Sequence, residues 1–235
     1  MNAINLLRTI AVAAALAATC VPPAAAQPAA SGADPRINER FYDPDLGEWT
    51  ARFEGESREI YALRQEIVTA SGVKAGMTVA DVGAGSGFMA MLFARQVGAE
   101  GRVIAAEISR PFAAAIAGRA KKEGVQNVTT VIGTQAETGL PADSVDIVFT
   151  SDVYHHFEQV AATLASIKRA LKTNGRFIVV DFERIPGVSS QNTLNHVRAG
   201  KETVIEEVLA AGFRLREEVK KLGLKTNYYL IFERL

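Results

Sequence analysis

The stretch DVGAGSGF, residues 81–88, decides the fold that this sequence predicts. It follows a short apolar run and places Gly83, Gly85 and Gly87 at alternate positions before a segment with helical spacing. Glycine has no Cβ, so the backbone there can turn tightly and approach a ligand closely. A strand that enters a helix through a glycine loop is typical of parallel sheets, which bind nucleotide-like ligands beyond the carboxyl ends of their strands.

The segments on either side of this loop alternate between expected strands and expected helices. Apolar spacing predicts strands at 77–82, 102–107, 128–132, 145–150 and 175–182, and helices at 56–72, 88–97, 110–123, 157–172 and 201–211. Two last strands, at 213–219 and 227–233, are close enough to pair as an antiparallel hairpin. Repeated strand–helix units predict an α/β fold, with a parallel sheet and helices on both faces.

Length and composition fit one globular domain with a short extension. The chain has 235 residues with 26 basic and 26 acidic side chains, which gives a net charge of zero. A nucleic-acid binder normally carries a basic surplus, so we expect no nucleic acid as a partner. The single cysteine, Cys20, lies in an N-terminal segment that we expect to be removed. Disulfides, thiolate metal sites and a cysteine nucleophile are then excluded from the mature chain.

The first residues have the pattern of a secretory signal peptide. Arg8 precedes an apolar run at 9–21, and two prolines and three alanines follow. We expect cleavage after Ala26, so 1–26 is the signal peptide and the mature protein is periplasmic or secreted. The apolar run is shorter than the ~20 residues of a membrane span, so we expect no stable span after cleavage. Two alternatives stay open: a lipoprotein anchored at Cys20, and an alanine-rich tail on a cytosolic protein.

A linker and a possible lid follow at 27–55. Residues 27–36 are rich in proline, alanine, serine and glycine, which is typical of a flexible linker. The next stretch either folds over a bound ligand as a lid or packs against the sheet. Its aromatic residues, which show no periodicity, are Phe41, Tyr42, Trp49, Phe53 and Tyr61. The main domain then covers 56–235.

The residues around the glycine loop indicate which nucleotide it holds. The second expected strand ends at Glu107, where a carboxylate can accept hydrogen bonds from both hydroxyls of a ribose. Phe88 stands where a dinucleotide fingerprint has its third glycine, and Asp81 suits an ammonium group better than a pyrophosphate. S-adenosylmethionine, which carries an adenosine and an ammonium group, therefore fits better than NAD. The alternatives are a plain glycine turn and a solvated carboxylate at the strand end.

Five segments, in this order, resemble the motifs of class I S-adenosylmethionine-dependent methyltransferases, and most of all the ubiquinone/menaquinone C-methyltransferase-like group. The segments are VADVGAGSG (79–87), VIAAEIS (103–109), LPADSVDIVFTSDVYHHF (140–157), IKRALKTNGRFIVVDF (167–182) and EEVLAAGFRL (206–215). The resemblance covers roughly residues 56–234. It implies a Rossmann-like, seven-stranded, mostly parallel sheet, with one antiparallel strand from the closing C-terminal hairpin.

The resemblance also implies roles around the cofactor, S-adenosyl-L-methionine. Asp81 and the three glycines would face the methionine part, Glu107 would hold the ribose, and Ile108 would lie beside the adenine. The family usually offers an acid to the adenine amino group, but this chain has Thr134 there, with Gln135 as a substitute. Such enzymes usually work where the cofactor is made, so export would require cofactor outside the cytoplasm, or a binding role.

The segment TSDVYHHF, 150–157, follows the fourth expected strand and lies next to the expected sulfonium. Methyl transfer needs alignment of the acceptor, with a base only where the acceptor must lose a proton. Asp152, Tyr154 and His155 are the polar groups that we expect to align or deprotonate a small-molecule acceptor. For His156 we expect a side chain that turns inward and binds the backbone at a helix start.

A second polar cluster, 181–200, follows the fifth expected strand and would overhang the same cleft. The alternative is a solvated loop with a helix cap. Its candidate substrate contacts are Asp181, Arg184, His196 and Arg198. All three histidines of the chain fall in these two regions, so a metal site is conceivable. The adjacent His155 and His156 should diverge, however, and we therefore predict no metal.

Two hypotheses of function follow. The first is an S-adenosylmethionine-dependent methyltransferase that acts on an unidentified small molecule. The second is an exported, non-catalytic protein of the same fold that binds an adenosine-like ligand. The complete glycine and ribose positions favour the first, whereas the export signal and Thr134 favour the second.

Overall fold

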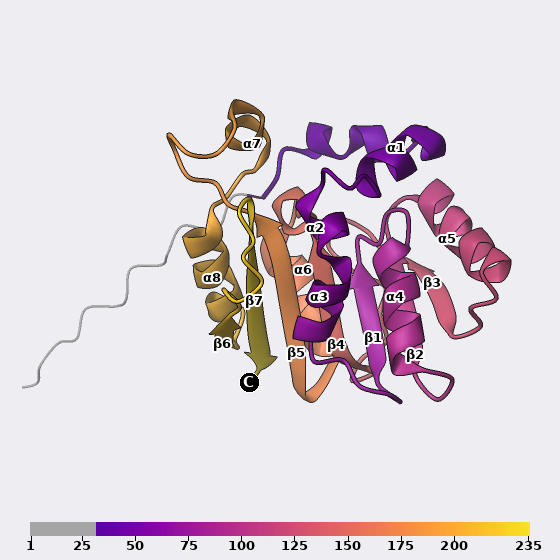
Figure 1. Cartoon of the computed structure of the whole chain (residues 1–235). Helices are drawn as coiled ribbons and strands as arrows, with labels where there is room; N and C mark the ends of the chain where they lie inside the picture. The colour runs from indigo at the N-terminus through magenta and orange to yellow at the C-terminus, as the bar shows by residue number, and fades with distance from the viewer. Residues whose placement is uncertain (1–31) are drawn as a thin grey trace, which may run out of the picture.

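One mixed sheet of seven strands forms the centre of the protein (Figure 1). The computed structural model describes residues 32–235, so the expected signal peptide and its cleavage after Ala26 lie outside the described residues. The strand order is β3-β2-β1-β4-β5-β7-β6. In chain order the strands are β1 (Thr78–Val82), β2 (Arg102–Glu107), β3 (Val128–Ile132), β4 (Val145–Ser151), β5 (Leu171–Phe182), β6 (Phe213–Glu218) and β7 (Asn227–Arg234).

The pairing of the strands confirms the expected fold class. β1 pairs in parallel with both β2 and β4, and the pairs β2–β3 and β4–β5 are also parallel. β7 pairs antiparallel with β5 on one side and with β6 on the other, which is the expected C-terminal hairpin. The chain order reverses between β1 and β4, and open sheets bind ligands beyond the carboxyl ends of their strands at such a point.

Helices cover both faces of the sheet. In the described residues the helices are α1 (Leu46–Phe53), α2 (Glu59–Ala62), α3 (Arg64–Ala70), α4 (Phe88–Val97), α5 (Arg110–Lys122), α6 (Val160–Ala170), α7 (Gln191–His196) and α8 (Lys201–Ala210), with 3₁₀ turns η1 (Pro35–Ile37), η2 (Glu39–Phe41) and η3 (Tyr154–His156). Figure 1 shows α3 and α4 in front of the sheet and α6 behind it. Side chains of a strand alternate between the two cores: Ile147 and Phe149 of β4 belong to one, and Val148 to the other.

Short polar residues cap two helices at the carboxyl edge of the sheet, α5 and α1. The Ser109 side chain accepts a hydrogen bond from the backbone N–H of Phe112 and so caps α5. The Asp45 side chain accepts from the backbone N–H groups of Gly47 and Glu48 and caps α1. The expected linker and lid therefore contains a regular helix, and Figure 1 shows α1 lying across the carboxyl edge of the sheet.

Two expected helices differ from the structure. The expected helix at 56–72 is interrupted at Leu63, which has φ −102° and ψ 21°. The break separates α3 from α2, whose Glu59 carboxylate accepts hydrogen bonds from backbone N–H groups of residues 225–227. The expected helix at 157–172 is shorter in the structure: Phe157 has extended backbone angles, so α6 begins at Val160, and it ends at Ala170 because Leu171 begins β5. Within residues 32–235, no helix is both long and apolar enough to cross a membrane.

Candidate active site

A cavity of about 770 Å³ lies at the carboxyl ends of the central strands, where the chain order reverses. This volume is within the range of about 300–1,000 Å³ that is typical of small-molecule and cofactor sites. Its walls come from the glycine loop after β1, the end of β2, the η3 turn after β4, and α1 and α7. These elements are far apart in sequence, so the cavity depends on the whole fold.

The glycine loop forms one wall, and its backbone leaves no room for side chains. Gly83, Gly85 and Gly87 have φ values of +72°, +54° and +78°. A Cβ at Gly83 would lie 2.4 Å from a methyl group of Val153, and one at Gly85 would lie 3.1 Å from the ring of Phe53. Such φ values disfavour any residue with a Cβ. Gly83 and Gly85 line the cavity, so the backbone there can lie close to a ligand. Gly87, which the sequence also predicted to contact the cofactor, does not line the cavity; a Cβ there would lie 2.8 Å from Ile116 of α5.

Glu107 lies beside this loop, as the sequence predicts. Its Oε2 accepts a hydrogen bond from the backbone N–H of Gly85 at 2.9 Å. Its Oε1 accepts from the backbone N–H groups of Ile108 and Ser109 at 2.9 and 3.1 Å. Burial raises the pKa of the carboxyl, although these hydrogen bonds act in the opposite direction. Glu107 is thus held rigidly, and Ile108 lines the cavity next to it.

Asp81 lines the cavity, and one of its two carboxylate oxygens accepts no hydrogen bond from the described residues. The side chain is 2% exposed, and its Oδ2 has no hydrogen-bond partner within the described part of the chain. Burial, and then the charge of Glu107, raise the pKa of Asp81 to about 7. A buried polar atom without a partner costs free energy. A cationic donor in the cavity would complete the site.

Aromatic side chains from the N-terminal segment cover the cavity. Phe41, Trp49 and Phe53 line it, and the ring centroids of Trp49 lie 4.9 Å from Phe41 and 5.3 Å from Phe53. Gln135 also lines the cavity, and its amide donates to the hydroxyl of Tyr42. Tyr61, by contrast, packs against Phe88 with centroids 5.4 Å apart.

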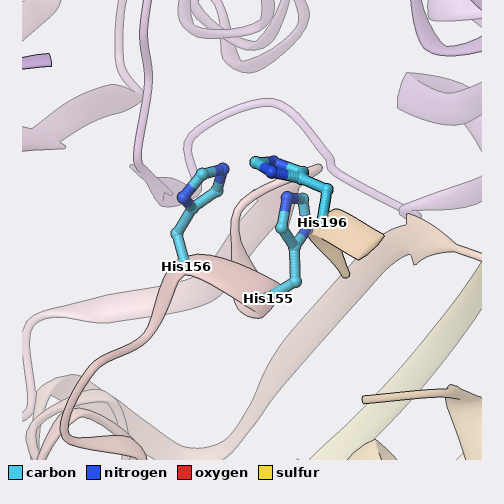
Figure 2. A group of neighbouring side chains, drawn as sticks. All are labelled: His155, His156 and His196. Carbon is cyan, nitrogen blue, oxygen red and sulfur yellow. The ribbon is translucent and has the colours of Figure 1, made fainter. Parts of the chain in front are cut away.

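The three histidines of the chain all line the cavity and lie next to one another (Figure 2). The ring centroids of His155 and His156 are 4.3 Å apart, so the expectation that these neighbours diverge is wrong. His196, at the end of α7, lies 5.0 Å from His155 and 5.1 Å from His156. Burial, together with the positive charge of neighbouring groups, lowers the pKa of His156 to about 2 and that of His196 to about 4.

Two of these rings are held by hydrogen bonds to other side chains, one of which lines the cavity and one of which does not. Nδ1 of His155 lies 2.7 Å from Oδ1 of Asp181, which is 1% exposed and does not line the cavity. Asp181 therefore positions His155, whereas the sequence predicted a direct substrate contact. Nδ1 of His156 lies 2.9 Å from Oδ1 of Asn38, so this ring binds a side chain rather than the backbone.

Asp152 lines the cavity, but both of its oxygens are engaged. Oδ2 accepts hydrogen bonds from Nε and Nη2 of Arg58 at 3.1 and 2.8 Å, and Oδ1 accepts from the amide of Asn227 at 2.6 Å. Its φ of +51° is unusual for a residue with a side chain. Burial raises the pKa of Asp152 despite the ion pair with Arg58. The residue ties α2, β4 and β7 together beside the site.

Besides Asp181, three further polar residues that the sequence singled out lie outside the cavity. Tyr154 is 0% exposed, and its hydroxyl donates to Oε2 of Glu207 at 2.8 Å. Arg198 donates to both oxygens of the same carboxylate at 2.8 and 2.7 Å. Arg184 donates to the carbonyl of Leu194 at 3.0 Å. None of the three predicted residues is among those that line the cavity, so the structure gives them packing and hydrogen-bonding roles in the fold.

Sequence reasoning missed several side chains of the site. Asn38 reaches His156 across 118 positions of the chain, and Arg58 reaches Asp152 across 94. Neither belongs to a motif, so no local signal could have found them. Arg52 lines the cavity from α1, a helix that the sequence did not predict because its segment shows no clear periodicity.

Comparison with known proteins identifies the family to which this chain is similar. The family model described as "Methyltransferase domain" matches residues 73–234. Over 159 residues the chain is 26% identical to the uncharacterized methyltransferase YcgJ of Bacillus subtilis (strain 168), covering 64% of this chain and 62% of that protein. Over 122 residues it is 29% identical to the ubiquinone/menaquinone biosynthesis C-methyltransferase UbiE of Marinomonas sp. (strain MWYL1), covering 52% and 49%.

A solved structure gives the same fold. The chain matches the crystal structure of a SAM dependent methyltransferase from Aquifex aeolicus with a TM-score of 0.64 and 22% identity, over 86% of this chain and 99% of that one. At this identity the likeness shows the fold. The chain spans about half to three fifths of the length of the two curated relatives.

Proposed function

The chain belongs to the methyltransferase-domain family, whose model spans 73–234, and we propose that it transfers a methyl group from S-adenosylmethionine to a small molecule bound in the cavity beside the histidines. The family and the fold together imply S-adenosylmethionine as the cofactor. What we propose is that the protein transfers the methyl group and that the acceptor is a small molecule.

The unused oxygen of Asp81 is the observation that carries this proposal. The cavity needs a cation at Asp81 and has a fixed carboxylate at Glu107, and both acids flank the same glycine loop. S-adenosylmethionine has an ammonium group at one end and, between its sulfonium and its adenine, a ribose with two hydroxyl donors. In NAD the pyrophosphate would instead bring negative charge towards Asp81, which the site does not favour. The residues present therefore fit S-adenosylmethionine.

Each part of the cavity has a role in holding the cofactor. Asp81 would bind the ammonium group, and Gly85 would bring the backbone close to the methionine part. Glu107 would accept hydrogen bonds from the ribose while its backbone donors keep it in place. Ile108 and Gln135 would lie at the adenine, because both line the cavity on the side of β2 and β3. When bound, the cofactor supplies an electrophilic methyl carbon on its sulfonium.

The acceptor end is formed by the histidines and by α1. His155 is 3% exposed and lines the cavity, and Asp181 holds its Nδ1. Its Nε2 can then accept a hydrogen bond or a proton from an acceptor hydroxyl. Trp49 and Phe53 line this end of the cavity and would shield the reacting atoms from water once cofactor and acceptor are bound. Because Asp152 already binds Arg58 and Asn227, we assign it a positioning role.

A transfer assay tests this function. The protein is incubated with S-adenosylmethionine that carries a deuterated methyl group and with a panel of quinols, phenols and amines. Mass spectrometry then follows labelled product and S-adenosylhomocysteine. We expect product with at least one acceptor, and none with Gly85→Val. A protein that binds the cofactor but forms no S-adenosylhomocysteine above the protein-free rate with any acceptor would favour the non-catalytic alternative.

A further inference from the structure

The three histidines have an arrangement that methyl transfer does not require. One candidate ligand nitrogen from each of His155, His156 and His196 lies within 4.8 Å of the others. Figure 2 shows the rings, from η3 and from the end of α7, turned toward one another. We propose that these three imidazoles bind a divalent transition-metal ion of the zinc class, with a coordination position open to the cavity. This inference does not depend on methyl transfer.

Hydrogen bonds fix the available nitrogen of the first imidazole. Nδ1 of His155 lies 2.7 Å from Oδ1 of the buried Asp181, and the backbone N–H of His155 lies 3.2 Å from the other oxygen. A carboxylate only accepts, so Nδ1 is the donor. Nε2 of His155 therefore keeps the lone pair that a metal ion needs.

An amide fixes the second imidazole in the same way. Nδ2 of Asn38 donates to the carbonyl of His156 at 3.0 Å and to the carboxylate of Glu158 at 2.7 Å. The amide oxygen of Asn38 is left to face Nδ1 of His156 at 2.9 Å, so it accepts that proton. Nε2 of His156 again keeps its lone pair. Metal-binding histidines typically donate their other ring N–H to a carboxylate or a carbonyl in this manner.

The three imidazole nitrogens would need to move only slightly closer together to bind one metal ion. Nitrogens about 2.1 Å from one tetrahedral ion are about 3.4 Å from one another. One candidate nitrogen of each ring already lies within 4.8 Å of those of the other two rings. His155 and His156 are held by their hydrogen bonds, whereas His196 is only partly buried and lies at the end of a six-residue helix. We therefore expect the His196 ring to make the adjustment.

Charged side chains of both signs lie near the cluster. Arg40, Arg52 and Glu158 line the same cavity as the rings. Asp181 contacts Nδ1 of His155, and Asp152, which also lines the cavity, is paired with Arg58. Charges of both signs are therefore present, and we expect coordination by the imidazoles to decide whether a cation binds.

The ligand set selects the class of metal. Three neutral nitrogens suit zinc, copper, iron or nickel, whereas magnesium and calcium prefer oxygen. Three protein ligands leave a position for a water molecule or a substrate group. That position would face the cavity, since all three histidines line it. An ion there would use the Nε2 lone pair of His155, so it would hold an acceptor oxygen itself in place of the imidazole.

Metal titration tests the site. The full chain is prepared without a polyhistidine tag, with Cys20→Ser in every protein compared, and is freed of metal with a chelator. Zn²⁺ is titrated by calorimetry and Co²⁺ by visible absorption. We expect one ion per chain and the absorption of four-coordinate Co²⁺. His196→Asn should weaken binding by about 100-fold or more, and Asn38→Ala by about 10–100-fold. Gln191→Ala, in the same helix but away from the cavity, should bind as the parent does.

Two results would overturn the proposal. One is a parent protein that gives neither heat with Zn²⁺ nor a spectrum with Co²⁺, which would leave three imidazoles packed together without a metal. The other is equal affinity in the parent and in a His196→Asn variant that is folded by circular dichroism. If that variant does not fold, long-range ¹H–¹⁵N spectra of the parent decide, because the chain has only 3 histidines. All three must shift together on addition of Zn²⁺.

Discussion

The affinity for the cofactor should depend on pH through Asp81. This side chain is buried with Oδ2 unpaired, and burial followed by the charge of Glu107 raises its pKa to about 7. An ammonium group against Oδ2 favours the ionised carboxylate. Below about pH 7 the carboxyl must therefore release a proton before the cofactor binds, and this proton release weakens binding.

The size of the change in cofactor affinity with pH follows from the pKa of Asp81. Each unit below the pKa reduces the ionised fraction about tenfold, which corresponds to ~1.4 kcal/mol. Affinity should rise about tenfold per unit between about pH 5 and pH 6.5 and level off above about pH 7. The ammonium group of the cofactor stays protonated across this range, since amino groups of this kind have pKa values near 7.7–8.0. In Asp81→Asn the slope should disappear, and affinity at about pH 7 should fall.

The same shift affects the stability of the cofactor-free protein. The folded pKa of Asp81 lies above its ordinary value of 3.8, so its contribution is fully present below about pH 4 and is lost as the pH rises to about 7. A shift of about three units corresponds to roughly 4 kcal/mol in the free energy of unfolding. Asp81→Asn should therefore raise the melting temperature more at pH 8 than at pH 5.

Fluorescence offers the assay, because Trp49 is the single tryptophan of the chain and lines the cavity. S-adenosylhomocysteine, which has the same ammonium group, is titrated into the parent and into Asp81→Asn across the pH range. Glu100→Gln, an exposed carboxylate outside the cavity, serves as the control and should keep the slope of the parent. A flat affinity in the parent, or an unchanged slope in Asp81→Asn, would refute the assignment of the ammonium group to Asp81.

Three further substitutions separate the cavity from the core. Gly85→Val should abolish cofactor binding, because φ is +54° and the new Cβ would lie 3.1 Å from Phe53; calorimetry showing parent-like affinity would contradict this. Phe53→Ala should speed cofactor dissociation in stopped-flow fluorescence by opening the cover, and an unaltered rate would show that α1 does not close the site. Tyr154→Phe should lower the free energy of unfolding by about 1–3 kcal/mol and leave cofactor affinity unchanged, because its hydroxyl binds the buried Glu207; weaker cofactor binding by the folded variant would argue against this placement.

The strands and the main helices could be predicted from the sequence because the local signals agree with the tertiary structure. Buried parallel strands are short apolar runs on both faces, as in β1 and β4, and glycines or short polar residues bound them. The expected helix at 88–97 coincides with α4, since Gly87 begins it and Gly98 ends it. The break at Leu63 left no comparable signal, because it arises where α2 meets the turn before β7.

The glycine loop and Glu107 could be predicted as part of the site because both follow strands directly. In the segment after β4 it was harder to predict which side chains point into the core and which point into the cavity. The positive φ of Asp152 and the η3 turn send Tyr154 into the core and bring His155 and His156 to the cavity together. Contacts across more than a hundred residues, such as Asn38 with His156, depend on the whole fold and leave no trace in a local pattern.

Calorimetric titration with S-adenosylmethionine tests the central claim most directly. The parent should bind one cofactor per chain. Glu107→Ala removes the carboxylate that we place at the ribose and should weaken binding by about 1–3 kcal/mol, because it leaves the hydroxyls unpaired. The matched control, Glu100→Ala, should bind as the parent does. Absence of binding by the folded parent, or equal affinities of the parent and Glu107→Ala, would contradict the account of the cavity as a cofactor site.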